Sequence, residues 1–307
     1  MNPRASAGAR LRSAALARLR DETRVLAEIA TQADAGDAQR IAELVDRLEP
    51  DVLVAAGGDG TAGLALRALL ASKRAQHSAL GFLPLGTGNN AARSFGLRAL
   101  EDGERALELA VAAIATGARR EVDVGVVDDR PFLGSFAIGM DADVLALRNR
   151  VQGRLAALGL DGGWGLYLGG VAASLMSGAH GGMARLSIDG VSEARRVYSL
   201  AVINAPVYAG PIRFDAENDC ADGMLDVLVV SSAWQYVSQY ASAWPRYLRV
   251  RGGFAAAPSP LLRRARSLSV EFERPVAAQA DGEPLGAATV FRVEVLARAL
   301  RVCLPDA

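Results

Sequence analysis

Short apolar runs alternate with amphipathic stretches over the first third of the chain. The run at 51–56 (Asp-Val-Leu-Val-Ala-Ala) is bounded by turn residues, which is typical of a buried parallel strand, and the run at 79–85 has the same character. A glycine-containing turn and then a helical pattern follow each run, the first at 62–70. A further helix is predicted at 104–116. Strands that alternate with helices in this way predict a doubly wound α/β fold with a parallel sheet.

Hairpin signals replace this alternation in the rest of the chain. The runs at 122–127 and 131–138 flank an Asp-Asp-Arg turn, and Asp189-Gly190 is a favoured two-residue hairpin turn. Additional strands are predicted at 199–204, 225–230, 267–272 and 290–296, and helical interruptions at 152–176 and 234–250. This half of the chain is therefore expected to be mainly antiparallel β-structure.

The change of pattern near Glu121 divides the chain into two expected domains. Residues 1–122 are predicted to form an α/β nucleotide-binding domain, and residues 123–307 an antiparallel, β-sandwich-like domain. We expect the last strand to pack back on the first domain. No long linker separates the two, so they are expected to share a cleft.

Composition narrows the classes of protein that remain. Apolar residues make up 51% of the 307 residues, which predicts a packed globular chain, and the formal net charge of zero argues against a nucleic-acid partner. Cys220 and Cys303 with His77 and His180 are too few for a disulfide framework or a zinc cluster, which fits a reducing cytoplasm. Lys73 is the only lysine and no GxxxxGK[ST] surrounds it, so a P-loop NTPase is not expected. No run approaches the ~20 apolar residues of a membrane span, and a soluble protein is expected.

Two glycine turns give the strongest chemical signal. Gly57-Gly58-Asp59-Gly60-Thr61 and Gly86-Thr87-Gly88-Asn89-Asn90 each lie between a predicted strand and a helix, where open α/β sheets bind ligands. Glycines let the backbone approach a phosphate, and a helix N-terminus offers free N–H groups. Asp59 would repel phosphates unless it holds a metal, orients a donor or takes a proton; the alternative is a tight turn with a local side-chain hydrogen bond. Two such turns at matching strand ends predict one phosphate-binding crevice.

The turns resemble the GGDGT and PxGTxND signatures of the diacylglycerol kinase catalytic family, which includes bacterial lipid kinases and sphingosine and ceramide kinases. The resemblance extends over most of the chain. The matching segments are Asn2 to Gly8 (NPxSG opening), Glu121 to Gly125 (the strand ending the first domain), Asn218 to Asp226 (DDGxLD loop) and Ala280 to Pro284 (DGE motif). GGDGT alone is shared with NAD kinases and phosphofructokinases, so the combination with the two later motifs is what makes the resemblance specific.

The resemblance implies an ATP-dependent lipid kinase that transfers the γ-phosphoryl group of ATP to a lipid hydroxyl. Diacylglycerol is the expected substrate and phosphatidic acid the product, in phospholipid biosynthesis, with Mg²⁺ as cofactor. It also implies a cytoplasmic protein in transient contact with the inner face of the membrane, and leaves a homodimer open. An NAD kinase-like enzyme and an inactive lipid-binding or regulatory relative remain as alternatives.

The family pattern also implies roles for single residues. The two glycine turns, Asn2 and the loosely matching Thr31 would contact the nucleotide. Glu283 would be the general base that takes the lipid hydroxyl proton, with Asp59 as its rival for this role. Asp123 would take part in an Asp–water–Mg²⁺ network at the transferring phosphoryl group.

A second, structural Mg²⁺ site is implied on the DDGxLD loop. The Asp222 side chain and the carbonyls of Asp219 and Met224 would hold the ion, since Mg²⁺ prefers hard oxygen ligands. The remaining reading of these residues is an acidic surface turn. The arginines and aromatic residues of 244–266 leave a similar choice open, between a basic patch that faces a membrane and an ordinary solvated surface.

Two departures from the family pattern affect these expectations. Asn90 stands where many members have aspartate, which removes one charge from the Mg²⁺ network and leaves Asp123 as the matching carboxylate. Relatives also have a strand before the motif that contains Asn2. Either the true start lies upstream or the sheet lacks an edge strand, and the contact from Asn2 depends on which holds.

Overall fold

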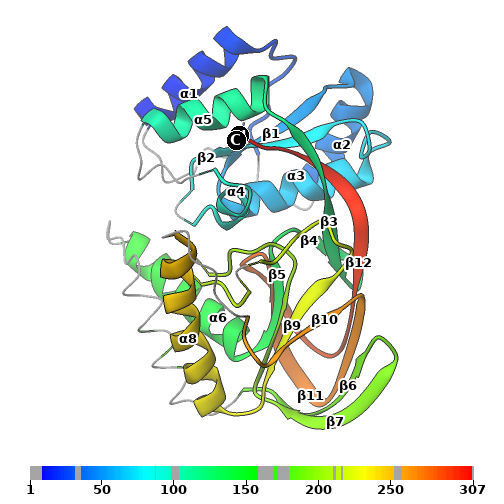
Figure 1. The fold of residues 1–307 in the computed structure, drawn as a ribbon. Helices are drawn as coiled ribbons and strands as arrows, with labels where there is room; N and C mark the ends of the chain where they lie inside the picture. The colour runs from blue at the N-terminus through cyan, green and yellow to red at the C-terminus, as the bar shows by residue number, and fades with distance from the viewer. Residues whose placement is uncertain are drawn as a thin grey trace.

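A computed structural model describes residues 9–31, 36–86, 88–97, 104–157, 169, 171, 174, 180–209, 212–215, 217–251 and 258–305. The predicted nucleotide contacts Asn2 and Thr87 lie outside the described residues, as do the side chains of 244–251. The structure confirms an α/β domain followed by a mainly antiparallel β domain (Figure 1).

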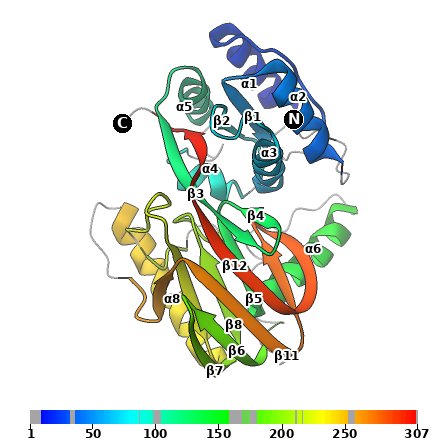
Figure 2. The same ribbon diagram turned by 90° about the vertical axis from the view of Figure 1, so that its right-hand side faces the viewer.

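The α/β domain is built on a pair of parallel strands, β1 and β2, whose register runs from Val52↔Ala79 to Gly57↔Pro84. Helices α3 and α5 lie on opposite sides of this pair (Figure 2), as the alternating pattern predicts. β2 is buried along its whole length, whereas Val52, Leu53 and Val54 of β1 are half-buried. The elements are α1 (Ala9–Glu22), α2 (Asp37–Leu48), β1 (Val52–Gly57), α3 (Asp59–Ala71), β2 (Ala79–Pro84), α4 (Asn90–Ser94) and α5 (Glu104–Ala115).

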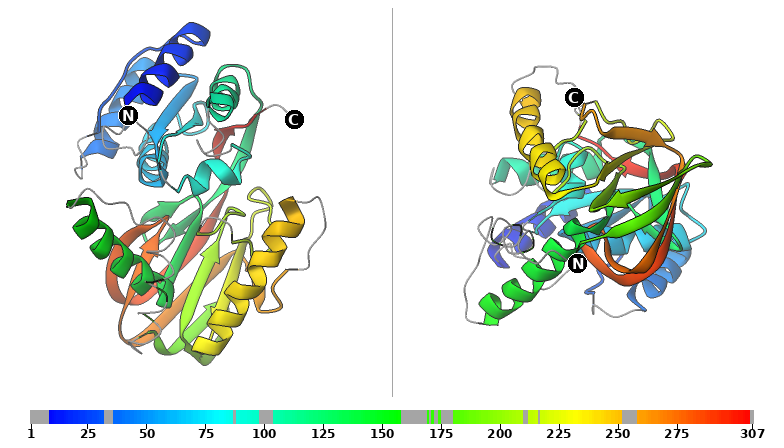
Figure 3. Two further views of the ribbon diagram at one scale, coloured as in Figure 1. Left: turned by 90° about the vertical axis from the view of Figure 1, so that its left-hand side faces the viewer. Right: turned by 90° about the horizontal axis from the view of Figure 1, so that it is seen from below.

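The β domain consists of antiparallel pairs with helices α6 and α8 on its outside (Figure 3). Apolar side chains of its strands form one core, and a second core that includes Tyr198, Phe214 and Tyr236 lies beneath the helices. The elements are β3 (Arg119–Val127), β4 (Arg130–Phe132), β5 (Ser135–Gly139), α6 (Met140–Ala157), β6 (Gly182–Ile188), β7 (Val191–Val197), β8 (Ser199–Ile203), β9 (Leu225–Val230), α8 (Ala233–Arg251), β10 (Leu262–Ala265), β11 (Ser267–Ala280) and β12 (Glu283–Cys303). None of the helices within the described residues is long and apolar enough to cross a bilayer.

The start of α6 corrects the sequence interpretation. The pattern predicts a helix from residue 152, whereas α6 begins at Met140, directly after Gly139. Gly139 has φ +77°, and a Cβ there would lie 2.6 Å from the Tyr198 carbonyl oxygen. Only glycine permits this sharp exit from β5. The mixed apolar and charged sequence of the first turns hides the helix, and most of the predicted span beyond residue 157 lies outside the described residues.

One long strand, β12, connects the two domains. It pairs antiparallel with β11 and β3 over most of its length, and its end pairs parallel with β2 through Arg301↔Ala79 and Val302↔Leu80. The main sheet order is therefore β1-β2-β12-β11-β5-β8-β9-β10. Figure 1 shows this strand leaving the β domain and entering the α/β domain. The first residue of β12, Glu283, is consequently held by a strand that belongs to both domains.

Candidate active site

The two glycine turns lie directly against each other. Leu85 N donates a hydrogen bond to Gly57 O at 2.9 Å. A Cβ on Gly86 would be 2.4 Å from the Gly58 Cα, so a side chain there could not be accommodated without separating the turns. The structure thus brings the two predicted phosphate-binding turns to one place, at the carboxyl ends of β1 and β2.

Asn89 holds the second turn in its shape. Its Oδ1 accepts a hydrogen bond from Gly86 N at 3.0 Å and its Nδ2 donates to Gly86 O at 2.6 Å. The residue is 2% exposed and has φ +53°, a left-handed conformation that asparagine tolerates better than most residues. In this structure the Asn89 side chain therefore serves the turn itself, and a direct nucleotide contact from it stays a prediction.

Asp59 is the first residue of α3 and connects the two turns. Its Oδ1 accepts a hydrogen bond from Ala91 N at 3.0 Å, and its Oδ2 accepts one from Asn90 Nδ2 at 3.3 Å. Burial raises the pKa of Asp59, while these two neighbours and the charges of Arg93 and Arg148 act in the opposite direction. An aspartate at position 90 would set two carboxylates face to face. Asn90 instead gives Asp59 a neutral donor, which is a structural reason for its departure from the family pattern.

Glu283 reaches this place from the β domain. A Cβ on Gly60 would be 3.3 Å from Glu283 Oε1, so the carboxylate lies over the first turn of α3, next to Asp59 in sequence. Its Oε2 accepts a hydrogen bond from Arg67 Nη1 at 3.2 Å and lies 3.9 Å from Arg130 Nη2. The two residues proposed as rival bases therefore both lie at the first turn of one helix.

Asp281 is a site residue to which sequence reasoning gave no role of its own. Its carboxylate accepts hydrogen bonds from the backbone N–H groups of Leu133, Gly134 and Ser135 at 2.7, 2.8 and 2.9 Å. Burial, with a smaller contribution from the charge of Asp59, raises its pKa to about 6. Asp281 thereby fixes the β4–β5 connection against the turn that presents Glu283. Arg67 was also missed, because nothing in its local sequence distinguishes it from other surface arginines.

Thr31 and Thr61 line one cavity of about 830 Å³. The cavity lies between the extended residues 23–31, α2, β1 and α3, and its lining is largely aliphatic. Thr61 is the buried end of the first glycine turn, where a Cβ on Gly57 would be 2.2 Å from Thr61 Oγ1. A cavity of this size, lined by both aliphatic and charged residues, has room for a small organic ligand. The loosely predicted Thr31 is thus joined to the glycine turns through a shared cavity.

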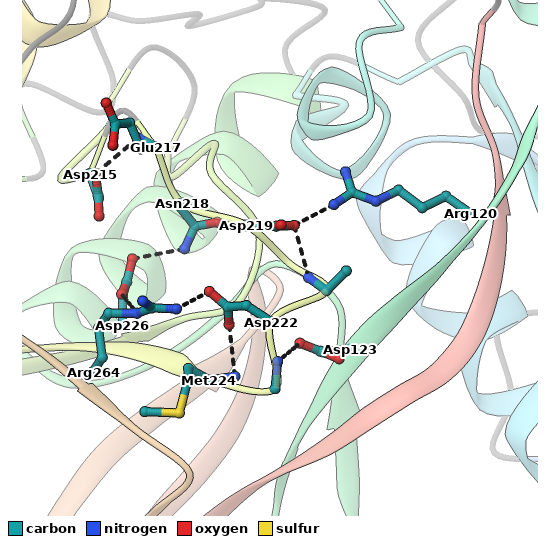
Figure 4. A network of polar contacts seen from close by, with 12 residues as sticks. Arg120, Asp123, Asp215, Glu217, Asn218, Asp219, Asp222, Met224, Asp226 and Arg264 are labelled. Carbon is teal, nitrogen blue, oxygen red and sulfur yellow. Dashed lines mark hydrogen bonds and ion pairs between the residues drawn. The ribbon is translucent and has the colours of Figure 1, made fainter.

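Asp123 has a different setting from the glycine turns. It is fully buried; its Oδ2 accepts a hydrogen bond from Gly223 N at 2.6 Å and its Oδ1 accepts one from Arg298 N at 2.8 Å. Figure 4 shows the carboxylate pointing toward the loop that contains Gly223. Both oxygens thus accept hydrogen bonds from backbone N–H groups, and the contacts of Asp123 connect the DDGxLD loop to β12. A role at the transferring phosphoryl group stays a prediction.

The DDGxLD loop itself brings Asp219, Asp222 and Met224 together, with each carboxylate engaged by the protein. Asp222 Oδ1 accepts a hydrogen bond from Met224 N at 2.9 Å and Oδ2 pairs with Arg264. Asp219 Oδ1 pairs with Arg120. Among the described residues, no group of three or more histidine, cysteine, aspartate or glutamate side chains is arranged to hold a metal. The carboxylates of Asp219 and Asp222 thus both pair with guanidinium groups, and the Mg²⁺ site stays a prediction.

Comparisons with known proteins agree with this architecture. Residues 1–127 match the diacylglycerol kinase catalytic domain, and residues 134–304 match the YegS C-terminal NAD kinase beta sandwich-like domain. A "probable lipid kinase YegS-like" of Enterobacter sp. (strain 638) is 36% identical over 134 residues, which are 44% of this chain and 42% of that protein. A "probable lipid kinase YegS" of Salmonella dublin is 36% identical over 125 residues, 41% and 40% of the two chains. The matched segment thus spans less than half the length of these relatives.

The fold has been seen in solved structures. A putative diacylglycerol kinase from Bacillus anthracis str. Sterne superimposes with a TM-score of 0.74 at 21% identity, covering 99% of this chain and 95% of that one. A second structure from that organism gives a TM-score of 0.69 at 19% identity with the same coverage. At this identity the likeness concerns the fold alone. The two domain matches, of which the second covers more than half of the chain, show that the protein belongs to the diacylglycerol kinase catalytic family, in its YegS-like form.

Proposed function

We propose that the protein is an ATP-dependent lipid kinase that phosphorylates a lipid hydroxyl, with diacylglycerol as its substrate. The observation that carries this proposal is the meeting of Glu283, from the β domain, with the paired glycine turns of the α/β domain over the first turn of α3. One side of the site then offers backbone N–H groups for phosphates, and the other offers a carboxylate. The relatives described as lipid kinases support a lipid as the acceptor.

The nucleotide is proposed to bind with its phosphates on the two turns. The close contact between Gly58 and Gly86 brings the backbones of both turns to one place, and the N-terminus of α3 favours negative charge there. The cavity lined by Thr31 and Thr61 supports a place for the nucleoside. A Mg²⁺ ion bound with ATP would neutralise phosphate charge. Asp59 is the carboxylate of the turns that would hold it, because each of its oxygens keeps a second lone pair.

Glu283 is proposed to accept the proton of the lipid hydroxyl. Arg67 holds Oε2, while Oε1 faces the start of α3, so the two oxygens have different surroundings. Oε1 is the atom that would take the proton. Phosphoryl transfer depends mainly on positioning and on charge neutralisation, and the proton acceptor adds a smaller factor. The fixed position of Glu283 is therefore the property that the arginine contact would protect.

The test compares Glu283→Gln and Asp59→Asn with the wild type, using labelled ATP and a panel that contains diacylglycerol, other lipids and NAD. Loss of a general base typically lowers kcat by ~10²- to 10⁴-fold, so Glu283→Gln should do so while ATP affinity is retained. Glu294→Gln is the matched control, because Glu294 lies on the same strand and is exposed.

Three results would change the assignment. Normal turnover by Glu283→Gln with loss in Asp59→Asn would make Asp59 the proton acceptor. Phosphorylation of NAD with none of the lipids would replace the lipid kinase by an NAD kinase-like activity. Nucleotide binding without transfer to any acceptor would identify an inactive relative.

The lipid acceptor places the proposed reaction at a membrane surface, and we expect transient contact with it. The arginines at 263 and 264 are each paired with an acidic residue, Glu193 and Asp222, so they contribute little net positive charge to a basic patch. Contact through apolar side chains is then the simpler expectation. Sedimentation with neutral and anionic vesicles measures the difference: equal binding to both supports apolar contact, and binding to anionic vesicles alone contradicts it.

A further inference from the structure

Two aspartates of the DDGxLD loop, residues 218–226, form ion pairs with arginines from two strands that are distant in sequence. Arg120 of β3 pairs with Asp219, and Arg264 of β10 pairs with Asp222. Arg264 Nε also lies 4.0 Å from Asp226 Oδ1. Figure 4 shows the Arg264 guanidinium pointing between Asp222 and Asp226. One cationic side chain thus faces two carboxylates of the loop.

This guanidinium pairs with the one carboxylate that the implied structural cation would use, that of Asp222. Asp222 Oδ1 accepts a hydrogen bond from Met224 N and Oδ2 pairs with Arg264, so an ion bound to this carboxylate would lie beside the guanidinium. A guanidinium is always charged and presents several donors in a fixed plane, which suits two neighbouring carboxylates. The buried Oδ1 of Asn218 has no hydrogen-bond partner among the described residues, but one amide oxygen does not replace a carboxylate ligand.

The loop matters to the rest of the fold because it is linked to β12. Gly223 N donates to Asp123 Oδ2, and Asp123 Oδ1 accepts from Arg298 N. Arg298 has φ +51° and lies within the register shift of β12 against β3 between Leu296 and Leu300. A group that fixes the loop therefore also fixes an irregular point of the strand that connects the two domains.

We propose that Arg264 takes the place of a structural metal ion in this protein, so that the 218–226 loop is held by an intramolecular cation and its stability is independent of Mg²⁺. The inference does not depend on the proposed kinase activity. A divalent ion at Asp222 would meet the repulsion of the guanidinium and would have to displace it. A chain with 34 lysine and arginine residues, all but Lys73 arginine, has the side chains for such a replacement.

The test uses the full chain without nucleotide, so that Mg²⁺ bound with ATP does not contribute. Thermal unfolding is measured in EDTA and in millimolar Mg²⁺ at matched ionic strength. The Tm of the wild type should be the same in both. Arg264→Met should lower the Tm by roughly 1–3 °C, as expected for a partly exposed ion pair in a chain of this size. Hydrogen exchange of the Gly223 and Met224 amides should be faster in this variant and unaffected by Mg²⁺ in the wild type.

Arg263→Met is the matched control. Arg263 precedes Arg264 on β10, so its side chain leaves the opposite face of the strand, and it pairs with Glu193 at 3.3 Å. The two arginine side chains are equally exposed, at 54% and 53%. Arg263→Met should leave exchange in the loop unchanged.

Two outcomes would overturn the proposal. The first is stabilisation of the nucleotide-free wild type by Mg²⁺ that disappears in Asp222→Asn, which would establish a metal site on the loop. The second is loop exchange in Arg264→Met that equals that of Arg263→Met. The hydrogen-exchange measurement keeps the test decisive even where the shift in Tm is small.

Discussion

Replacing Gly60 by alanine perturbs the position of Glu283 and little else. The new Cβ would stand 3.3 Å from Glu283 Oε1, its only neighbour within 4 Å, so the carboxylate must move by a few tenths of an ångström. Gly60 lies in the first turn of α3 and does not have a positive φ, so alanine fits the backbone. In a helix interior alanine is favoured over glycine by up to about 1 kcal/mol. The variant should therefore be as stable as the wild type or slightly more stable.

Activity should respond in the opposite direction. A displacement of about 1 Å at a reacting group can cost on the order of 10²-fold in rate, so a few tenths should lower kcat by roughly 3- to 10-fold. The KM for ATP should rise as well, because Gly60 belongs to a turn that is proposed to hold the phosphates, so kcat at saturating ATP is the quantity that reports on Glu283. Steady-state kinetics with labelled ATP and diacylglycerol, beside urea denaturation, measure both effects.

Gly63→Ala is the control for Gly60→Ala. It lies one turn further along α3, and its Cβ would only make an ordinary contact with Arg67 Nη1 at 3.5 Å. It gains the same helix propensity without touching Glu283, so its kcat should equal that of the wild type. Equal activity of the two variants would refute the placement of Glu283 at the reacting group.

Three further perturbations test other parts of the site. Gly86→Ala should lower the free energy of unfolding by about 1–3 kcal/mol and abolish ATP binding, because its Cβ would lie 2.4 Å from the Gly58 Cα. Isothermal titration calorimetry measures the binding. Gly182→Ala is the control, because the nearest atom to its Cβ would be Phe272 Cδ1 at 3.9 Å. Asn90→Asp would set a second carboxylate against Asp59 Oδ2, so the Tm without metal should fall and Mg²⁺ should restore part of the lost Tm. An unchanged Tm would contradict the contact between residues 59 and 90. Burial raises the pKa of Asp226 to about 6 from 3.8, so its contribution to stability is complete below about pH 4 and is lost as the pH rises through 6. The free energy of unfolding, measured by urea denaturation, should fall between about pH 5 and 7.5, and this fall should be about 1 kcal/mol smaller in Asp226→Asn than in the wild type. An equal fall in both proteins would count against the raised pKa.

Local patterns predicted the parts of the fold that depend on neighbouring residues. The strand–turn–helix units at 51–61 and 79–91 follow from buried aliphatic runs, each ending in glycine, and the Asp189-Gly190 turn follows from its two residue types. The continuation of β11 to Ala280 was not predicted, because Glu273, Arg274 and Pro275 interrupt the alternation after Phe272.

The contacts that complete the site have no local signal. Arg67 and Glu283 are 216 residues apart, and Arg264 and Asp222 are 42 apart. Each arginine resembles the solvated arginines around it in sequence, and only the assembled sheet shows which carboxylate it meets. The same applies to Asp123, whose buried position is set by strands that the sequence pattern does not align.

The path of β12 has a consequence for how the chain is made. The sheet of the α/β domain is completed by Arg301 and Val302, which follow the whole β domain in the chain. A nascent chain that has finished α5 therefore holds β2 with one edge unpaired until the whole β domain has followed. Domains that fold in order from the N-terminus are the usual case in translation. Here the sheet of the α/β domain cannot be completed first, and the unpaired edge of β2 is the point at which a chaperone or a misplaced strand would compete with the native partner.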